Sequence, residues 1–354
     1  MTLDGPVLVV GAGLLGTSIA LALRARGVDV ALRDVSEEHL RTATGLGAAN
    51  LDAATVEPRL VVVAVPPDHL AAEVAVALTG TDAVVTDVGS IKVAPLEGVR
   101  RTVPEALPRY VGSHPMAGSE RSGPLAATAA LFDGRPWAVT PHESSDPGAV
   151  EAVTELARVC GATPVMLSPE EHDQAVARTS HLPHLLASLV AGRLADAPAD
   201  HLALSGQGVR DVTRIAAGDP ALWQQIVAAN RDALTALLHD VRQDVDSLLT
   251  ALAADDRKAI GALLGRGVAG TAVIPGKHGG PSRPEATVFV VIPDHPGELA
   301  RLFTDVGEIG VNVEDVRIDH DPAREYGLLE LSVAAESTDH LLDALADRGW
   351  TAHR

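Results

Sequence analysis

The stretch Val7-Leu8-Val9-Val10-Gly11-Ala12-Gly13-Leu14-Leu15-Gly16 decides how the first half of the chain folds. Its four apolar residues are typical of a buried strand, and the Ala- and Leu-rich residues after Gly16 predict a helix. The first glycine allows a tight turn, the second lets a pyrophosphate approach the backbone, and the third lets helix pack on strand. Free amides at the helix N-terminus would face the anion. The stretch therefore predicts a dinucleotide site formed by Gly11, Gly13, Leu14, Leu15 and Gly16.

The end of the second predicted strand indicates which dinucleotide binds. Asp34 lies about 20 residues after the loop, where a carboxylate accepts hydrogen bonds from the adenosine ribose hydroxyls. This position favours NAD. Arg33 could instead meet the 2′-phosphate of NADP, but Asp34 would repel that phosphate. Val65 and Pro66 are predicted to line the same site, and an ordinary strand-to-helix turn that binds no cofactor is the alternative.

The composition limits the class of protein. The chain has 354 residues, 46% of them hydrophobic, and domains hold about 100–200 residues, so we expect three domains. No apolar stretch reaches the ~18 residues of a membrane span and no basic leader precedes the first strand, which together predict a cytoplasmic protein. The net charge is −19 and no run of Lys or Arg occurs, so we expect no nucleic-acid partner. Cys160 is the only cysteine, which excludes a disulfide within the chain.

Two patterns of apolar residues divide the first 270 residues. Residues 1–168 alternate short Val-rich strands with helical stretches, which predicts a doubly wound, Rossmann-like α/β domain. Residues 169–270 place apolar residues three and four apart and predict an all-helical substrate and dimerisation domain. Asp219 as N-cap and Pro220 in the first turn mark the expected start of its longest helix. Its apolar surface exceeds the needs of one helical layer, so we expect a homodimer. The first domain's strands are predicted at Val7–Val10, Val28–Leu32, Leu60–Val65, Ala83–Asp87, Tyr110–Ser113, Trp137–Thr140 and Pro164–Met166.

The rest of the chain predicts a linker and a third domain. Residues 271–284 are rich in Pro, Gly and polar residues, as linkers are. Residues 285–354 read strand, helix, strand, strand, helix, strand, which is the ferredoxin-like βαββαβ order. These elements are predicted at Val288–Ile292, Glu298–Glu308, Val311–Asp319, Gly327–Ala334, Ser337–Asp347 and Trp350–His353.

Two polar clusters follow predicted strands and are expected to face the nicotinamide, because open α/β sheets bind ligands beyond the carboxyl ends of their strands. The first spans residues 87–92 and contains Ser90, and the second spans residues 112–120 and contains His114. An alcohol loses its hydroxyl proton as the hydride leaves, and imidazole titrates near working pH, so His114 is the natural proton acceptor. Ser90 could hold its tautomer. A structural role for a histidine at a strand end is the alternative.

The helical domain contains two further polar motifs. Thr179-Ser180-His181-Leu182-Pro183-His184 places two histidines on one helical face and a proline that should kink the helix. Metal binding is discounted because no third ligand lies at a zinc-like spacing. In residues 206–214 a glycine turn precedes Arg210, Asp211 and Arg214, and arginine suits a bidentate grip on a carboxylate. The alternative is a surface helix whose arginines pair with Asp211 or Asp219.

Together these motifs resemble the prephenate/arogenate dehydrogenase family of tyrosine biosynthesis over nearly the whole chain. The resemblance rests on residues 112–141 together with DVGSIK, TSHLPH and RDVTRIAAGDPALW, all in the family's order and spacing. It implies that NAD oxidises a cyclohexadiene, prephenate or arogenate, which loses carbon dioxide and becomes aromatic. It also implies the site residues. His114 accepts the hydroxyl proton, Ser90 hydrogen-bonds it, Arg214 grips a carboxylate, and the pocket is completed by Ser180, His181, His184, Arg210, Asp211 and Trp223. Many relatives are expected to have Lys where this chain has Arg210.

The C-terminal segment resembles an ACT domain, a module that binds small molecules in allosteric enzymes. The matching residues are 294–299 at the first strand-to-helix turn and 310–314 at the second strand. A helix N-terminus at Gly297 could receive a ligand carboxylate, with Asp294, Leu299 and Asn312 beside it. Feedback by tyrosine follows as a hypothesis, and a role in dimer contacts alone is the alternative.

Two other functions share part of this pattern. A 3-hydroxy acid dehydrogenase or imine reductase shares the Rossmann and helical domains but relies on a Lys in the helical domain. No Lys occurs between Lys92 and Lys258, which favours chemistry at His114. A sensor that binds NAD without turnover would not need Ser90, His114 and Arg214 together. No metal is expected.

Overall fold

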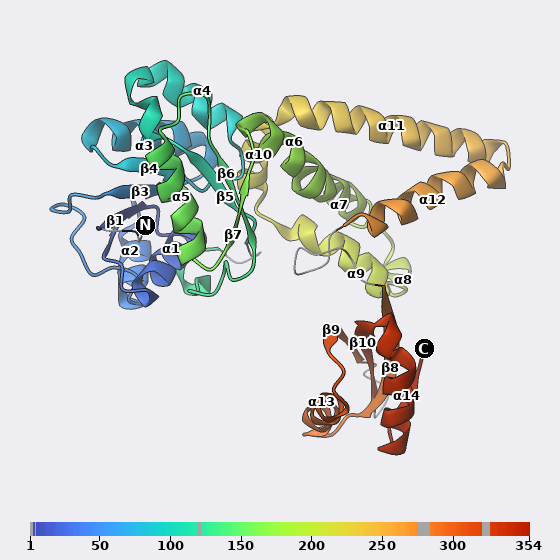
Figure 1. Ribbon diagram of the computed structural model, residues 1–354. Helices are drawn as coiled ribbons and strands as arrows, with labels where there is room; N and C mark the ends of the chain where they lie inside the picture. Colours follow the sequence, from blue (N-terminus) through green and yellow to red (C-terminus); the bar gives the residue numbers. More distant parts are fainter. Residues whose placement is uncertain (1–2, 4, 119–121, 275–283, 321–325) are drawn as a thin grey trace. The chain divides into compact units, whose positions relative to one another are not determined.

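The computed structural model describes residues 3, 5–118, 122–274, 284–320 and 326–354 of the chain (Figure 1). The chain forms two compact units, Met1–Leu249 and Thr250–Arg354, which we call the N-terminal and C-terminal units. Of the predicted linker, residues 275–283 lie outside the described residues, as do residues 119–120 of the second polar cluster. No described helix is long and apolar enough to cross a membrane.

A parallel four-stranded sheet in the order β2-β1-β3-β4 is the centre of the N-terminal unit. Val-rich runs form these strands because β-branched side chains suit a sheet that is covered on both faces. Two hydrophobic clusters cover the two faces, one including Leu23 and Leu156 and the other Leu70 and Val99. The elements are β1 (Val7–Val10), α1 (Leu14–Ala25), β2 (Val30–Arg33), α2 (Glu37–Gly45), β3 (Leu60–Val63), α3 (Pro67–Gly80), β4 (Val84–Asp87) and α4 (Val93–Thr102).

A second sheet, β5-β6-β7, completes the Rossmann-like part, and a bridge between Val85 and Tyr110 connects the two sheets. β5 and β6 pair antiparallel, whereas β6 and β7 are parallel. The strand predicted at Tyr110–Ser113 is shifted, so His114 lies within β5 rather than after it. The elements are η1 (Pro104–Arg109), β5 (Gly112–Pro115), η2 (Pro124–Ala126), β6 (Pro136–Thr140), α5 (Pro147–Val159) and β7 (Thr163–Met166).

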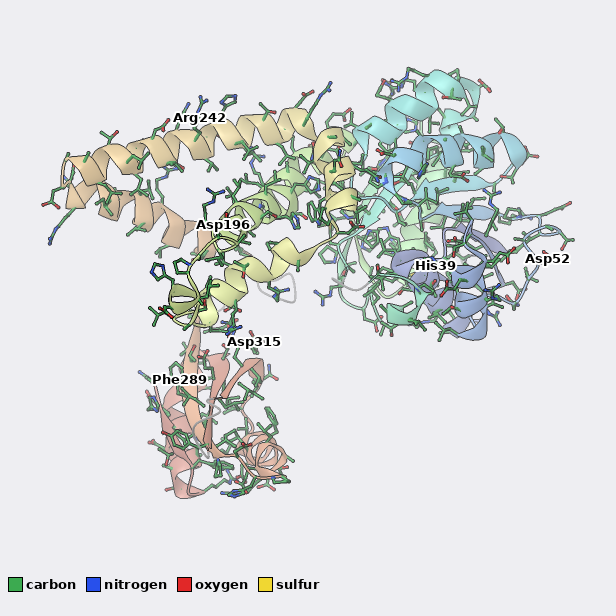
Figure 2. All side chains as sticks on the ribbon, turned by 180° about the vertical axis from the view of Figure 1, so that it is seen from behind. His39, Asp52, Asp196, Arg242, Phe289 and Asp315 are labelled. Carbon is green, nitrogen blue, oxygen red and sulfur yellow. The ribbon has the colours of Figure 1, made fainter. Side chains whose placement is uncertain are left out.

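Between Pro169 and Ala272 the described elements are all helices, as predicted. A capping box between Ser168 and Glu171 starts the first of them. The helix expected to start at Asp219 does have Asp219 as its N-cap, but it ends at Ala229, and the longest helix begins only at Arg231. Exposed polar side chains such as Arg242 project from this long helix (Figure 2). The helices are α6 (Pro169–Val176), η3 (Ala177–His181), α7 (Leu182–Gly192), α8 (Ala199–Leu202), α9 (Gln207–Arg214), η4 (Ile215–Ala217), α10 (Pro220–Ala229), α11 (Arg231–Ala253) and α12 (Arg257–Ala272).

The C-terminal unit contains the predicted βαββαβ order. Its antiparallel sheet runs β11-β8-β10-β9, so the first and third strands are central. Inward-facing residues alternate along β10, and the core contains Leu302, Leu331 and Leu345. The elements are β8 (Glu285–Pro293), α13 (Glu298–Ile309), β9 (Val313–His320), β10 (Tyr326–Ala334), η5 (Ala335–Ser337), α14 (Thr338–Asp347) and β11 (Thr351–His353).

Candidate active site

The glycine loop between β1 and α1 has the geometry that its sequence predicts. Gly11 has a φ of +103°, and a Cβ there would overlap the Ala64 carbonyl. A Cβ on Gly16 would overlap the Gly11 carbonyl oxygen and lie 3.2 Å from the Ala64 Cβ. A Cβ on Gly13 would meet no atom within 4 Å among the described residues, its two chain neighbours aside. Gly11 and Gly16 are thus required by the chain itself, whereas Gly13 leaves open space that a pyrophosphate fits.

The carboxylate of Asp34 lies beside this loop. It accepts hydrogen bonds from the Ala12 amide at 2.5 Å and the Ser36 amide at 2.6 Å. The neighbouring Arg33 is exposed and forms an ion pair with Glu73, with the side-chain atoms 3.1 Å apart. Val65 and Pro66 follow β3 next to the loop and are partly or fully exposed, as cofactor-lining residues should be. Leu14 and Leu15 in the first turn of α1 are also partly exposed.

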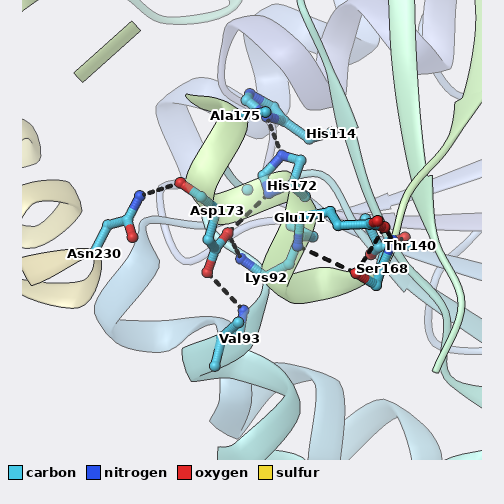
Figure 3. A network of polar contacts seen from close by, with 12 residues as sticks. Lys92, Val93, His114, Thr140, Ser168, Glu171, His172, Asp173, Ala175 and Asn230 are labelled. Carbon is cyan, nitrogen blue, oxygen red and sulfur yellow. Dashed lines mark hydrogen bonds and ion pairs between the residues drawn. The ribbon is translucent and has the colours of Figure 1, made fainter. Parts of the chain in front are cut away.

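His114 hydrogen-bonds a residue that the sequence reasoning did not select. Its Nδ1 lies 2.9 Å from Nε2 of His172 on α6, and the two rings meet edge to face (Figure 3). Burial, together with the nearby His172 and Lys92, lowers the pKa of His114 well below the usual value of 6.5. The ring is therefore neutral near pH 7. Among the described residues its Nε2 has no hydrogen-bond partner.

Asp173 extends this chain of contacts to the start of α4. Its Oδ1 lies 2.8 Å from Nδ1 of His172, and the carboxylate also accepts the amides of Lys92 at 2.8 Å and Val93 at 2.9 Å (Figure 3). The amides at a helix N-terminus lack partners within the helix, so Asp173 supplies the cap that α4 itself lacks. One carboxylate thus fixes both α4 and His172.

The first polar cluster is mostly buried rather than facing the nicotinamide. Asp87 and Lys92 are 0% and 1% exposed and form an ion pair. Lys92 also donates to the Ser113 carbonyl at 2.7 Å, and Tyr110 donates to Asp87 at 2.7 Å. Burial lowers the pKa of Lys92, and it raises the pKa of Tyr110 well above 10. The expectation of a ligand-facing cluster fails for Asp87 and Lys92 because both side chains point into the core.

Ser90 is partly exposed in the loop between β4 and α4. The structure gives it no hydrogen bond to His114 among the described residues. His172 takes the position at the His114 Nδ1 that we expected for Ser90, since β5 places this nitrogen toward α6. Ser90 is therefore available to a ligand.

His181, His184 and Trp223 form the second polar group of the N-terminal unit. The His184 ring stacks on Trp223 at 3.5 Å between centroids, and the His181 ring meets Trp223 edge-on. Asn230 lies 3.2 Å from Nδ1 of His181 and donates to the Asp173 carbonyl at 2.8 Å. Burial lowers the pKa of His181 to about 4, and its buried Nε2 has no hydrogen-bond partner among the described residues. An amide donates to Nδ1, so Nε2 carries the hydrogen and can donate to a bound molecule.

Pro183 lies just after the junction of two helical segments that contain these histidines. The chain passes from α6 through the π-helical turn η3, which contains Ser180, into α7, where Pro183 occupies the first turn. π-helical turns often mark functional sites. Ser180 is partly exposed beside the buried His181. The part of the chain that the structure describes contains no group of residues suited to a metal ion.

Arg210 and Arg214 are exposed on α9, and neither forms an ion pair within the described residues. Asp219 instead caps α10 through the Ala221 amide. Asp211 accepts a hydrogen bond from Gln207 at 2.9 Å. Immediately after α9, the Ile215 carbonyl hydrogen-bonds His184, so the end of this helix adjoins the histidine and tryptophan group. Arg214 is thus a cation available to a ligand next to that group.

The predicted ligand residues of the C-terminal unit are only partly brought together. A small hollow is lined by Asp294, His295 and Leu299, together with residues of β9 and β10. Gly297, with a φ of +97°, is the N-cap of α13. The side chain of Asn312 donates to Glu314. Gly297 and Asn312 do not line the hollow.

Three polar residues of this site were missed from sequence, namely His172, Asp173 and Asn230. The first two lie on the buried face of α6 with Pro169 and Val176, at the three- and four-residue spacing of a helix. The sequence does contain a signal for these two, because they are polar residues at positions where an amphipathic helix normally has buried apolar ones. Asn230 gives no such signal. The apolar pattern continues across it from α10 into α11, so the sequence does not indicate that α10 ends there.

Comparison with known proteins identifies the family of the chain. A family model described as the nucleotide-binding domain of prephenate dehydrogenase matches residues 19–166, and one described as its dimerization domain matches residues 168–266. The chain is 38% identical to the probable prephenate dehydrogenase NovF of Streptomyces niveus, over 98% of each chain. It is 28% identical to the prephenate dehydrogenase of Bacillus subtilis (strain 168), over 93% of this chain and 92% of that one.

Solved structures give the same result. Prephenate dehydrogenase of Aquifex aeolicus in complex with hydroxyphenyl propionate and NAD+ has a TM-score of 0.68 at 26% identity, covering 76% of this chain and 98% of that one. Arogenate dehydrogenase of Synechocystis has a TM-score of 0.64 at 27% identity, covering 75% and 98%. By sequence and by fold, the chain belongs to the prephenate dehydrogenase family.

Proposed function

We propose that the chain is an NAD-dependent prephenate dehydrogenase that converts prephenate to 4-hydroxyphenylpyruvate with loss of carbon dioxide. One observation supports this most strongly. His114 is a neutral histidine beside the nucleotide-binding fold, and its Nε2 has no hydrogen-bond partner among the described residues while its Nδ1 is held by His172. That is the state in which imidazole can take a hydroxyl proton.

The residues present fit the cofactor. The space at Gly13 accommodates a pyrophosphate at the N-terminus of α1, and Asp34 lies where a ribose would bind, with Val65 and Pro66 along the same edge. When bound, NAD accepts the hydride that leaves the substrate's ring carbon. Asp34 would disfavour the extra phosphate of NADP, and Arg33 is occupied by Glu73.

The chain's own residues supply positioning and proton transfer. His114 Nε2 accepts the proton of the 4-hydroxyl, and Ser90 hydrogen-bonds the same oxygen. Arg214 grips a substrate carboxylate, and His181 donates through Nε2, which has no partner among the residues that the structure describes. Ser180, His184 and Trp223 shape the pocket, with Arg210 and Asp211 at its edge. Loss of carbon dioxide gives an aromatic ring, so the step needs orientation rather than a strong base.

The function is tested with the purified protein, prephenate and NAD, by following the appearance of NADH. His114→Asn keeps a polar side chain of similar reach but offers no basic nitrogen. We expect turnover to fall by about 10²-fold or more while the Kd for NAD stays unchanged. Wild-type turnover in His114→Asn would refute the assignment of the base.

Arogenate is the second candidate substrate, because the Synechocystis structure of similar fold is an arogenate dehydrogenase. Arogenate carries an amino acid where prephenate carries a keto acid. The kcat/KM values for the two substrates, measured side by side, decide which one the enzyme uses. A higher value for arogenate would make the enzyme an arogenate dehydrogenase that forms tyrosine directly.

Assembly and regulation complete the proposal. A domain division at residues 168, 270 and 284, with a homodimer formed through residues 169–270, is supported by the dimerization-domain match, and light scattering tests the mass. The C-terminal βαββαβ unit would act as an ACT domain that binds tyrosine, supported by Asp294 and Leu299 in its hollow. Removal of residues 285–354 should then abolish inhibition by tyrosine. Inhibition that persists in the truncated chain would place the effector elsewhere.

A further inference from the structure

We propose that His172 and Asp173 form a relay behind His114 that sets its tautomer and takes up the positive charge formed when it accepts a proton. The proposal rests on the proposed function and adds two positioning residues to it. It is carried by an unbroken line of contacts, from His114 Nδ1 to His172 Nε2 and from His172 Nδ1 to the Asp173 carboxylate (Figure 3).

The Asp173 carboxylate, at the end of this line of contacts, determines which ring nitrogen of each histidine carries hydrogen. A carboxylate only accepts, and that of Asp173 already receives two backbone amides, so His172 Nδ1 must be the donor. In a neutral imidazole the other nitrogen is then an acceptor, so His172 Nε2 accepts from His114 Nδ1–H. His114 Nε2 is left with its lone pair. The carboxylate thereby selects the one neutral tautomer of His114 that can act as a base toward a ligand.

The relay is held rigidly because its members come from elements that are fixed for other reasons. His172 and Asp173 lie in α6, whose first turn is closed by the capping box of Ser168 and Glu171. The carboxylate is bound to the first amides of α4, and the Asp173 carbonyl is bound by Asn230. His172 is 1% exposed, so water cannot replace either of its partners.

The charged and titratable groups around the relay come from several elements. Lys92 at the start of α4 disfavours a cation on either histidine, and Asp87 at the end of β4 opposes that effect at His172. His181 in η3 adds a further imidazole near His114. Within the part of the chain that the structure describes, the one carboxylate in direct contact with an imidazole of the relay is that of Asp173 at His172. A positive charge is therefore better placed on His172 than on His114.

The proton balance of the step follows from these positions. The substrate's O–H bond breaks, its proton binds His114 Nε2, and the oxygen's electron pair forms the new carbonyl as the hydride leaves. The Nδ1 proton of His114 moves to His172 Nε2, so His172 becomes the imidazolium and Asp173 remains a carboxylate. The bond to the ring carboxylate then breaks, carbon dioxide leaves, and the electron pair of that bond passes through the ring to the oxygen as the ring becomes aromatic. This oxygen takes the proton back from His114 Nε2, and His172 returns its proton to His114 Nδ1.

Two substitutions at His172 separate the relay from simple packing. His172→Leu removes the acceptor for His114 Nδ1–H, and His172→Gln keeps a carbonyl acceptor that cannot take up a proton. We expect kcat to fall by about 10²-fold or more in His172→Leu and to be partly restored in His172→Gln, with the Kd for NAD unchanged in both. Asp173 is a poorer choice because its substitution also removes the cap of α4.

The pH profile distinguishes the relay from packing, because loss of a residue that only fills space would not shift it. The acid limb of kcat/KM should shift in His172→Leu, because protonation of His114 is then no longer coupled to His172 and Asp173. A kcat within about twofold of wild type in His172→Leu would overturn the proposal. Equal losses in the two variants with an unmoved acid limb would also overturn it, since His172 would then only fill space.

A measurement on the resting enzyme keeps the relay testable if the proposed function fails. Long-range ¹H–¹⁵N spectra of protein labelled at histidine distinguish the two neutral tautomers, and His114→Asn and His172→Gln assign the signals. We expect both rings to carry hydrogen on Nδ1 near pH 7. Hydrogen on Nε2 of His114 would overturn the relay whatever the substrate, whereas absence of turnover with the predicted tautomers would overturn only the proposed function.

Discussion

Replacement of Lys92 by Met should strongly destabilise the N-terminal unit. Lys92 and Asp87 are 1% and 0% exposed, so removal of the ammonium leaves a carboxylate that water cannot reach. The remaining donors to that carboxylate are the Gly89 amide at 2.9 Å and the Tyr110 hydroxyl at 2.7 Å, and neither carries a charge. The Ser113 carbonyl also loses its donor at 2.7 Å.

The magnitude follows from the cost of a buried, unpaired charge. Removal of one partner of a buried ion pair costs about 3–5 kcal/mol, which is a large part of the ~5–15 kcal/mol that stabilises a typical domain. Methionine fills a volume similar to that of the lysine stem, so a cavity adds little. We therefore expect Lys92→Met to lower the free energy of unfolding by about 3–5 kcal/mol.

Urea unfolding at pH 7, followed by circular dichroism, measures this loss. The matched control is the double variant Asp87→Asn/Lys92→Met, whose amide still accepts from Gly89 or Tyr110 but leaves no charge. It should recover about 2 kcal/mol or more relative to Lys92→Met alone. A loss below about 1 kcal/mol in the single variant, or no recovery in the double variant, would refute the reasoning.

Three further predictions concern the cofactor loop, the substrate grip and the histidines. Gly16→Ala should cost roughly 1–3 kcal/mol in thermal unfolding because its Cβ overlaps the Gly11 carbonyl, whereas Gly13→Ala should change stability by less than about 0.5 kcal/mol and still weaken NAD binding in calorimetry. Equal stability losses in the two variants would contradict the assigned roles. Arg214→Ala should raise the KM for prephenate by roughly 10- to 100-fold with the Kd for NAD unchanged, since one charge-assisted contact is lost, and an unchanged KM would remove Arg214 from the site. Burial lowers the pKa of His181 from 6.5 to about 4, so between these values the unfolded chain binds more protons than the folded one, and stability falls as the pH falls through this window. The drop attributable to His181 is roughly 3 kcal/mol, and urea unfolding from pH 7 to 4 should show a shallower pH dependence in His181→Gln than in wild type.

The glycine loop and most strands could be predicted from sequence because their causes are local. The positive φ of Gly11 and the contact of Gly16 with the Gly11 carbonyl lie within one short loop, although Ala64, which follows β3, also crowds both glycines. The apolar run Val7–Val10 is sufficient to place β1, and apolar residues at alternate positions place β10. The exception is β5, which is shifted so that His114 lies inside it, because its register is set by antiparallel pairing with β6.

The partners of His114 could not be predicted because they depend on contacts between distant segments. His172 comes from α6, and the α4 amides that orient Asp173 are about 80 residues earlier in the chain. The end of α10 has a similar cause. Asn230 lies between α10 and α11, where its side chain bonds His181 and the Asp173 carbonyl, and neither bond is visible in an apolar repeat that continues to Leu252.

The proposed reaction needs neutral histidines for proton transfer and a positive charge that binds the substrate, and burial provides only the first. It lowers the pKa values of His114, His172, His181 and His184 together, so these rings are neutral near pH 7 and can accept or donate protons, but they contribute no positive charge to attract a substrate. Prephenate is an anion and the chain has a net charge of −19, so the attraction must come from arginine, whose charge does not depend on burial. Arg214, exposed and without an ion pair in the described part of the chain, is placed for that task beside the neutral histidines. The enzyme should therefore stay active in acid only while its histidines are neutral. Loss of activity in acid should follow protonation of His114, while Arg214 still binds the substrate. A KM that stays constant as kcat falls would reveal this.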